Sequence, residues 1–163
     1  METTTYYQSP LGVLKITAFD AAIRSIAFTE GNDVYDSTQA DAAKECIAQL
    51  DEYFAGKRTA FDFRYEFGVG SEFQQRVWAE LVKIPFGETI SYKQLALRLG
   101  DVNLIRAAGT ANGKNPMAIV VPCHRVIGAD GKLVGYAGGL WRKQWLLEHE
   151  QKLTGTRQAS LFG

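Results

Sequence analysis

Hydrophobic and polar residues alternate with a period of two over much of the first 30 residues. The alternating segments are 3–7, 11–17 and 23–28, with Ser9-Pro10 and Asp20 at the breaks. Alternation predicts strands with one buried face, and Pro and Asp favour turns between strands. The chain is therefore predicted to open with a three-stranded antiparallel meander.

The spacing changes to that of a helix between residues 37 and 54. Ala43, Ile47, Leu50 and Phe54 share one helical stripe, and Gly56 follows as a stop signal. Cys46 lies beside this stripe, so it is interpreted as a packing residue. This segment predicts a helix against the sheet.

A short strand at 61–63 and a linker at 68–70 are predicted next, from the alternation of Phe61 with Phe63 and from two closely spaced glycines. We place a boundary there. The expected fold class is α/β (α+β), with an N-terminal α/β domain at 1–70 and a mainly helical domain at 71–153. Residues 154–163 are predicted to be a disordered tail.

The second domain begins with two repeats of one helix-start signal. Ser71 is followed three residues later by Gln74, and Ser91 by Gln94, each ahead of apolar residues at helical spacing. This is the capping-box pattern. The first helix is expected to end at Pro85 and the second at Gly100.

A helix-turn-helix follows from the next segment. After a short connection at 101–103, residues 104–112 have helical character, with Asn103 as the expected cap. Ala107, Ala108 and Gly109 give this helix a face without bulk, beside the long cation Arg106. Two interpretations stay open: a large partner lies close to the backbone, or a second helix packs tightly there.

The candidate chemistry lies in the run from Ile119 to Gly128. The β-branched residues 119–121 predict a buried strand that Pro122 ends, with Cys123 at its end. Arg125 and His124 are nearby cations that would lower the thiol pKa and favour a nucleophilic thiolate. A buried core cysteine is an equally good interpretation of the local sequence, because free cysteine is commonly buried.

Charge is divided unevenly along the chain although the total is zero. Residues 1–70 hold 6 Lys+Arg and 11 Asp+Glu, a balance of −5, whereas residues 71–163 hold 12 and 7, a balance of +5. An anionic partner such as nucleic acid is expected at the second half, with a solvated basic face as the alternative. The polar start of the chain and the lack of a long apolar run predict a cytoplasmic protein with reduced cysteines and no membrane partner.

Several motifs together resemble the 6-O-alkylguanine-DNA alkyltransferases of bacterial type. They are Asn-Gly-Lys-Asn-Pro at 112–116, Val-Pro-Cys-His-Arg-Val-Ile-Gly at 121–128, Gly-Tyr-Ala-Gly-Gly-Leu at 135–140 and Leu-Leu-Glu-His-Glu at 146–150. The resemblance implies a winged-helix-like second domain and single-turnover repair. An alkylated guanine leaves the duplex, and its alkyl group moves irreversibly to the protein's own cysteine.

The resemblance also implies roles for individual residues. Cys123 would accept the alkyl group, and a water would link it to His124 and Glu150. Tyr92 would protonate the departing base, and Asn115 would order the turn near the cysteine. The implied contacts to DNA and base are Arg106, which replaces the flipped nucleotide in the stack, the small residues Ala107, Ala108 and Gly109 at the minor groove, and Arg125, Tyr136 and the main chain of Cys123, Val126 and Ala137.

The chain departs from the family pattern before the recognition helix. Val102, Leu104 and Ile105 stand where many members have a proline and two alanines, so the seating on DNA is open. No cofactor is expected, and the few Cys and His residues make a structural zinc improbable.

The end of the chain carries a further short motif. Gln158, Leu161 and Phe162 resemble the peptide that docks into bacterial DNA sliding clamps. A monomer is expected. Two competing functions are a binding-only relative that recognises alkylated DNA without chemistry and an unrelated cysteine hydrolase using Cys123, His124 and Glu150.

Overall fold

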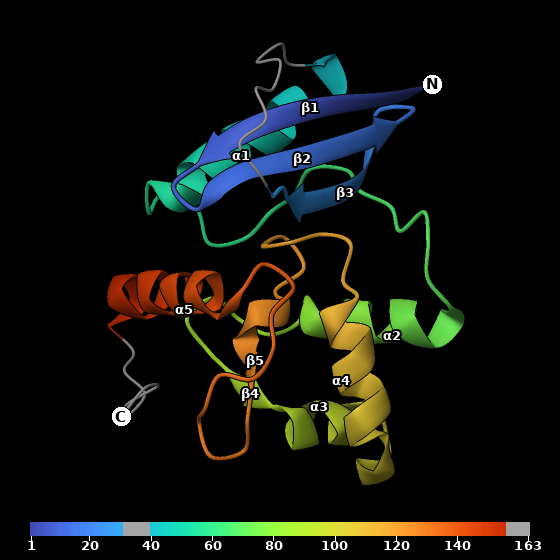
Figure 1. Ribbon diagram of the computed structural model, residues 1–163, viewed down its shortest axis with the longest axis vertical. Helices are drawn as coiled ribbons and strands as arrows, with labels where there is room; N and C mark the ends of the chain where they lie inside the picture. The colour runs from blue at the N-terminus through green and yellow to red at the C-terminus, as the bar shows by residue number, and fades with distance from the viewer. Residues whose placement is uncertain (31–39, 156–163) are drawn as a thin grey trace. The chain divides into compact units, whose positions relative to one another are not determined.

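The computed structural model describes residues 1–30 and 40–155, which form two compact units (Figure 1). Unit 1 comprises Met1–Val69 together with Pro116–Ala118, and unit 2 comprises Gly70–Asn115 together with Ile119–Gly163. Of the predicted tail at 154–163, the structure describes only Thr154 and Gly155, and Thr154 is the last residue of the final helix. The clamp-like motif at 158–162 lies outside the described residues. The class is mixed α and β, as predicted.

Unit 1 is a three-stranded antiparallel sheet with one helix against it. The strands are β1 (Glu2–Ser9), β2 (Gly12–Phe19) and β3 (Ala22–Phe28), in the order β1-β2-β3. The 3₁₀ turn η1 (Asp41–Ala43) precedes helix α1 (Lys44–Phe54), which covers one face of the sheet (Figure 1). Leu14 and Ile16 of β2 and Leu50 of α1 are fully or almost fully buried. The meander and the helix are confirmed.

The predicted strand at 61–63 is wrong. These residues are irregular, and the backbone pairs with the sheet only later, through a bridge between Ile23 and Tyr65. Phe61 and Phe63 instead stack edge to face, with ring centroids 6.1 Å apart. Aromatic packing of this kind does not require the strict alternation of a strand.

A segment from far along the chain completes unit 1. Ile26 donates its N–H to the carbonyl of Pro116 at 2.9 Å, and Ala118 donates its N–H to Ile26 at 2.9 Å. Met117, between them, is fully buried. The chain therefore returns to β3 shortly before Cys123.

Unit 2 is mainly helical. Its elements in chain order are α2 (Glu72–Leu81), β4 (Ile90–Ser91), α3 (Tyr92–Arg98), η2 (Val102–Leu104), α4 (Ile105–Gly113), η3 (Cys123–Arg125), β5 (Val126–Ile127) and α5 (Leu140–Thr154). Both capping boxes are confirmed, because Ser71 and Ser91 each accept the N–H three residues on. β4 and β5 pair in parallel. Within residues 1–30 and 40–155, no helix has the length and apolar character needed to cross a membrane.

Two local predictions in unit 2 are wrong. The second helix of the helix-turn-helix, α4, is not capped by Asn103, because its N-cap residue is Leu104 and makes no side-chain cap. Asp101 instead caps the preceding turn η2, where its carboxylate accepts the Asn103 N–H at 2.9 Å. The apolar run 119–121 is buried but forms a turn and not a strand, because Ile119 has φ +72°. A left-handed residue cannot continue an extended strand.

Candidate active site

Cys123 and His124 lie on one short turn of 3₁₀ helix, η3, directly after Pro122. Cys123 is 8% exposed and His124 is 0% exposed. The N–H of Cys123 donates to Val121 at 2.8 Å, and the N–H of Val126 donates to the carbonyl of Cys123. The turn removes the strand geometry that would have sent the thiol and the imidazole to opposite faces.

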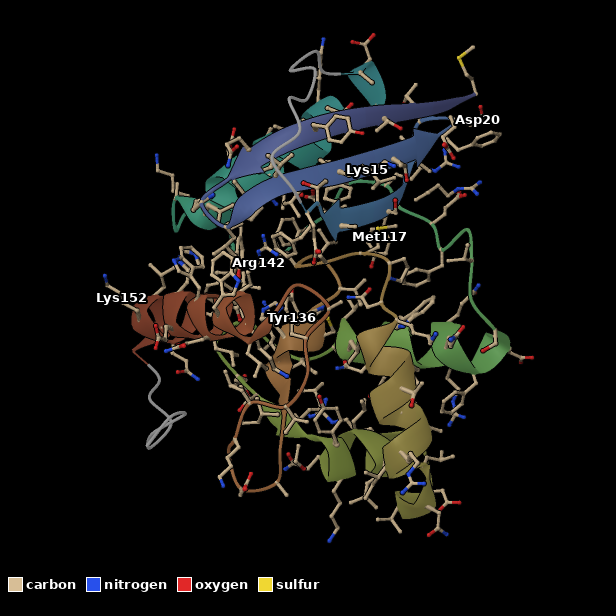
Figure 2. The ribbon with its side chains drawn as sticks, in the orientation of Figure 1. Lys15, Asp20, Met117, Tyr136, Arg142 and Lys152 are labelled. Carbon is tan, nitrogen blue, oxygen red and sulfur yellow. The ribbon has the colours of Figure 1, made fainter. Side chains whose placement is uncertain are left out.

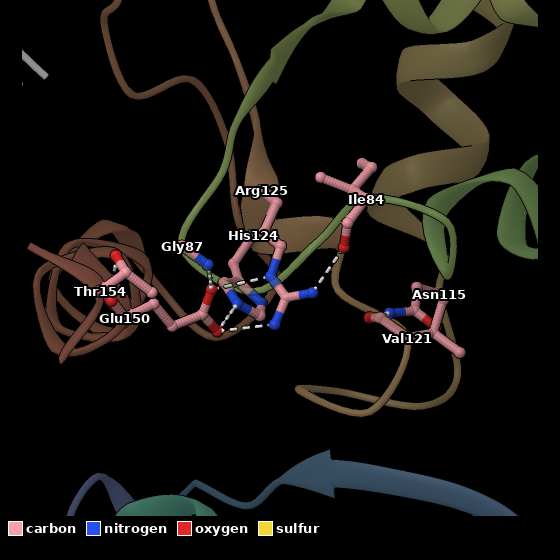
Figure 3. A network of polar contacts seen from close by, with 8 residues as sticks. All are labelled: Ile84, Gly87, Asn115, Val121, His124, Arg125, Glu150 and Thr154. Carbon is pink, nitrogen blue, oxygen red and sulfur yellow. Dashed lines mark hydrogen bonds and ion pairs between the residues drawn. The ribbon is translucent and has the colours of Figure 1, made fainter. Parts of the chain in front are cut away.

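Glu150 of α5 is the centre of a buried polar network (Figure 3). Its Oε2 lies 2.8 Å from His124 Nε2. Arg125 donates from Nε to Oε1 at 2.7 Å and from Nη2 to Oε2 at 3.0 Å, and the Gly87 N–H donates to Oε1 at 3.3 Å. The third arm of Arg125 donates to the carbonyl of Ile84 at 2.7 Å. One carboxylate is thus fixed by a bidentate guanidinium, an imidazole and a backbone amide.

This network sets the charge states of its members. Burial raises the pKa of the Glu150 carboxyl, but His124 and Arg125 outweigh it and hold that pKa well below its usual range. Burial lowers the pKa of His124; Glu150 opposes this effect, and Arg125 and Lys143 add to it. His124 is therefore neutral near pH 7. Its Nδ1 is buried and has no hydrogen-bond partner within the described part of the chain, so this nitrogen is the one available to exchange a proton.

The role predicted for Arg125 is wrong. It was expected to act as a cation beside the thiol and as a contact to the base or DNA. Its side chain is 6% exposed, and its guanidinium is committed to Glu150 and Ile84. A guanidinium with these bonds orients the carboxylate and presents little surface to a ligand.

The cation that acts on the thiol is Lys143, which sequence reasoning missed. Burial raises the pKa of the Cys123 thiol, whereas a hydrogen bond from Asn115 and the positive charge of Lys143 oppose this rise. Lys143 lies on α5 with the buried residues Leu146, Leu147 and Glu150. Helical spacing from Glu150 could have placed it on the inner face.

Asn115 and Asn112 order the turn that carries the cysteine. Asn115 Nδ2 donates to the carbonyl of Val121 at 2.7 Å, as expected for a residue that stabilises this turn (Figure 3). Asn112, which was not predicted, donates from Nδ2 to the carbonyl of Cys123 at 3.4 Å and is 4% exposed. Helix α4 is thereby tied at its C-terminal end to η3.

A pocket of about 410 Å³ opens between α3, α4 and the loop before α5. It is lined by Tyr92, Ile105, Arg106, Gly109, Thr110, Asn112, Gly113, Val134, Gly135 and Tyr136. This volume is in the range of small-molecule sites. Tyr92 donates its hydroxyl to the carbonyl of Val134 at 3.0 Å. Burial and then the charge of Cys123 raise the pKa of Tyr92, so the phenol keeps its proton.

Helix α4 exposes only part of the face of small residues that the sequence predicts for it. Arg106 and Ala107 are exposed, and Gly109 lines the pocket, where an added Cβ would lie 3.5 Å from the Tyr92 ring. Ala108 is fully buried, so its predicted contact with DNA is wrong. At this one position, the open alternative of tight packing is the correct one.

The loop from β5 to α5 carries the remaining predicted residues. Tyr136 lies in this loop (Figure 2), and burial raises its pKa well above the usual value. Ala137 is exposed, whereas Val126 is buried in β5. Asp130-Gly131 forms a turn, in which Gly128 donates its N–H to Lys132 at 2.8 Å, but no strand follows it in the described residues.

The described residues contain no group of three or more His, Cys, Asp or Glu placed to hold a metal ion. Cys46 is buried in unit 1, and burial raises its pKa to about 12. This thiol is interpreted as a packing residue.

Comparison with known proteins identifies the family. Residues 72–152 match the 6-O-methylguanine DNA methyltransferase DNA-binding domain, and residues 3–67 match the ribonuclease-like domain of the same proteins. A methylated-DNA–protein-cysteine methyltransferase of Mycolicibacterium paratuberculosis is 45% identical over 150 residues, which are 88% of this chain and 89% of that one. The chain belongs to the 6-O-methylguanine DNA methyltransferase family.

Other members of the family agree over most of the chain. A methylated-DNA–protein-cysteine methyltransferase of Methanosarcina acetivorans is 42% identical over 88% of this chain and 95% of that one. A Mycobacterium tuberculosis member solved in complex with DNA has a TM-score of 0.83 and 42% identity, covering 92% of this chain and 93% of that one. The resemblance of the cysteine motifs to this family is confirmed.

Proposed function

We propose that this methyltransferase repairs DNA by moving the methyl group of 6-O-methylguanine to the sulfur of Cys123. The observation that carries the proposal is the placement of Cys123 beside a neutral, buried His124 whose other ring nitrogen is fixed by Glu150. The DNA complex of a relative with the same fold supports DNA as the partner. The base has to leave the duplex to reach so buried a thiol.

The proposed transfer is a nucleophilic displacement at the alkyl carbon. The thiol proton passes by way of a water to His124 Nδ1, and the sulfur attacks the alkyl carbon. The C–O bond then breaks, and its electron pair stays on the base, which takes a proton from Tyr92. The product is a thioether, which has no leaving group for a return reaction at this site, so each molecule acts once. Glu150 orients His124 and stabilises the cation that forms on it.

The pocket is the proposed site of the flipped base. Tyr136 would stack on the base, while the main chain of Cys123, Val126 and Ala137 would hydrogen-bond its edge. Arg106, exposed at the start of α4, would fill the gap left in the duplex. Approach from the minor groove suits this arrangement, because side chains inserted there unstack base steps. The exposed side chains of Val102 and Ile105 would meet DNA next to Arg106.

Mass spectrometry of the intact protein tests the proposal. After incubation with duplex DNA bearing 6-O-methylguanine, we expect one added methyl mass, located on the Cys123 peptide. Cys123→Ser should bind the DNA and gain no mass, and Cys46→Ser serves as the matched control that reacts normally. DNA binding by the natural chain without any adduct would support a binding-only relative instead.

A binding partner at the end of the chain, a monomeric state and a cytoplasmic location remain predictions from sequence. Gln158, Leu161 and Phe162 are proposed to dock into a bacterial sliding clamp. Titrating a clamp with the full chain and with a chain ending at residue 157 tests this. Equal affinity of the two forms would remove the proposal.

A further inference from the structure

Asn112 of α4 is a buried amide beside Tyr92 of α3. The two helices lie against each other (Figure 1). Gly109, three residues before Asn112, shares the same side of α4, and an added Cβ there would lie 3.5 Å from the Tyr92 ring. Asn112 is 4% exposed and lines the same pocket as Tyr92. Helix α4 therefore places an amide next to the proposed acid of the reaction.

The Asn112 side chain donates in two directions. Its Nδ2 donates to the carbonyl of Cys123 at 3.4 Å, and it hydrogen-bonds the hydroxyl oxygen of Tyr92. The Tyr92 proton itself is donated to the carbonyl of Val134 at 3.0 Å, so the phenol oxygen accepts from Asn112 through a lone pair. An amide nitrogen carries two hydrogens and can serve both acceptors. Asn112 thus connects the residue that carries the thiol to the residue that carries the acidic proton.

The carbonyl of Cys123 fixes which way the Asn112 amide points. In the reverse orientation Oδ1 would face this carbonyl, and two buried acceptors would lie together. In the observed orientation Oδ1 has no hydrogen-bond partner among residues 1–30 and 40–155. The amide therefore keeps its donor side toward Tyr92, even though one buried acceptor is left without a partner.

A donor at this place matters once Tyr92 has lost its proton. The Val134 carbonyl suits the neutral phenol, but it would face the oxygen of the tyrosine anion as a second acceptor. Burial and the charge of Cys123 raise the pKa of Tyr92, whereas the hydrogen bond from Asn112 lowers it, because a donor favours the charged form. The other charged or titratable groups around this phenol are Lys143 on α5, 5.9 Å from the ring centre, and Arg106 and Tyr136 in the pocket wall.

We propose that Asn112 is a positioning residue for the alkyl transfer: its amide holds Tyr92 in place and stabilises the tyrosine anion that remains when the departing base takes the proton. The inference rests on the proposed function, in which Tyr92 is the acid. The proton moves from the Tyr92 oxygen to the base as the C–O bond breaks. Asn112 neither gains nor loses a proton and donates its hydrogen bond throughout.

The first experiment compares two alkylations of Cys123 by mass spectrometry. Transfer from 6-O-methylguanine in duplex DNA, at saturating DNA, expels a base that takes a proton, whereas iodoacetamide expels iodide and needs none. Asn112→Leu should slow the first reaction about tenfold, because a hydrogen bond to a charged oxygen is lost, and should leave the second unchanged. Asn112→Asp keeps the shape and replaces the donor nitrogen by oxygen, so it serves as the second variant. Equal slowing of both reactions would make the role of Asn112 purely structural and overturn the inference.

Tyr92→Phe supplies the matched background. Without the phenol the Asn112 amide has no acceptor there, so adding Asn112→Leu to Tyr92→Phe should cause no further slowing. Losses that add in the double variant would place the effect of Asn112 elsewhere and contradict the proposal. Asn115→Leu is the control for the turn that carries Cys123. Asn115 donates to Val121 and favours the thiolate, so this variant should slow both alkylations.

A second measurement keeps Asn112 in place. In NMR spectra of the side-chain amides, one of the two Asn112 amide protons should shift upfield in Tyr92→Phe, because its acceptor oxygen is gone. Tyr7→Phe is the control, since the Tyr7 hydroxyl donates to Asp51 in unit 1 and should leave the Asn112 signals unchanged. Asn112 signals that do not move in Tyr92→Phe would refute the contact, whether or not the Asn112 variants fold.

The two proposals fail in different ways. If the natural chain forms no adduct with methylated DNA, the proposed function fails, while the amide signals still decide whether Asn112 binds Tyr92. If the natural chain repairs DNA and Asn112→Leu repairs it at the same rate, the role of Asn112 fails alone.

Discussion

Helix α5 buries a carboxylate and an ammonium seven residues apart, and the protein holds the two charges in different ways. Glu150 has an imidazole, a bidentate guanidinium and a backbone N–H around it. Lys143 has two backbone carbonyls and the face of a tyrosine ring. The pKa of Glu150 is held far below its usual range, whereas burial lowers the pKa of Lys143 to about 8.

Within one site, the charge of Glu150 is therefore fixed, whereas the charge of Lys143 can change. A carboxylate with an opposite charge and several donors stays ionised across the physiological range, so it fixes His124 permanently. The neighbours of the Lys143 ammonium offset only part of the cost of burying its charge, so its pKa lies close to physiological pH. Its charge therefore responds to nearby changes. The His124 side of the site is therefore the fixed part, and the Lys143 side is the tunable part.

The largest expected effect comes from breaking the Glu150 network. Arg125→Met should lower the free energy of unfolding by about 3–5 kcal/mol, because it leaves a buried carboxylate without its main counter-charge. Urea denaturation at pH 7 measures this. The double variant Arg125→Met, Glu150→Leu should be less destabilised than Arg125→Met alone. A single variant as stable as the natural protein would show that the guanidinium does not support Glu150.

The free energy of unfolding measured at acid pH tests the same Arg125→Met substitution a second time. The pKa of Glu150 is lower in the folded protein than its usual value of 4.5, so its contribution is present above about pH 4.5 and is lost as pH falls. Arg125→Met should weaken this dependence, because the folded pKa of Glu150 then rises.

Lys143→Met should change how the free energy of unfolding depends on pH above pH 8. The folded pKa of Lys143 is about 8 and its usual value is 10.5, so between these pH values the unfolded chain binds more protons. The stability of the natural protein relative to Lys143→Met should therefore rise by up to about 3 kcal/mol from pH 8 to pH 10.5. Taking the difference between the two proteins cancels the other titrating groups. A flat difference would mean that Lys143 is not neutralised by burial.

Gly87→Ala tests the backbone conformation and the close packing of the residue whose N–H donates to Glu150. Gly87 has φ +83°, and an added Cβ would lie 2.6 Å from the Thr154 side chain. We expect a loss of about 1–3 kcal/mol from strain and the close contact, measured by thermal unfolding. Gly131→Ala is a matched control, because Gly131 has φ +82° and nothing lies within 4 Å of its added Cβ. Equal losses would assign the whole effect to backbone strain.

The smallest effect is expected for Tyr92→Phe. The Val134 carbonyl loses one donor but keeps Lys143, so the free energy of unfolding should fall by only about 0.5–1 kcal/mol. Urea denaturation of Tyr92→Phe, Lys143→Met and the double variant measures the coupling at this carbonyl. Strictly additive losses would indicate that the two donors do not share it.

Much of this fold follows from local sequence signals. Ser71 and Ser91 mark their helix starts because a side-chain cap is a contact over three residues. The run 119–121 is misassigned because apolar residues can be buried in a turn as well as in a strand, and the φ of Ile119 is set by the surrounding fold. Periodicity reports burial more reliably than backbone conformation.

The site was predicted unevenly for a related reason. Cys123, His124 and Glu150 were brought together by a resemblance, because their contact joins residues 26 positions apart. Arg125 was assigned to the thiol since it is near in sequence, yet its bonds go to α5 and to Ile84. Lys143 was missed because a lysine on a helix is normally a solvated residue.

The return of Pro116–Ala118 to β3 has a consequence for dividing the protein. The chain passes between the two units three times, after residues 69, 115 and 118. A fragment of residues 70–163 alone would therefore leave Pro116–Ala118 without Ile26, its hydrogen-bonding partner. This segment ends at Ala118, five residues before Cys123. A chimera that exchanges residues 1–69 must therefore also exchange Pro116–Ala118, because these three residues belong to the same unit.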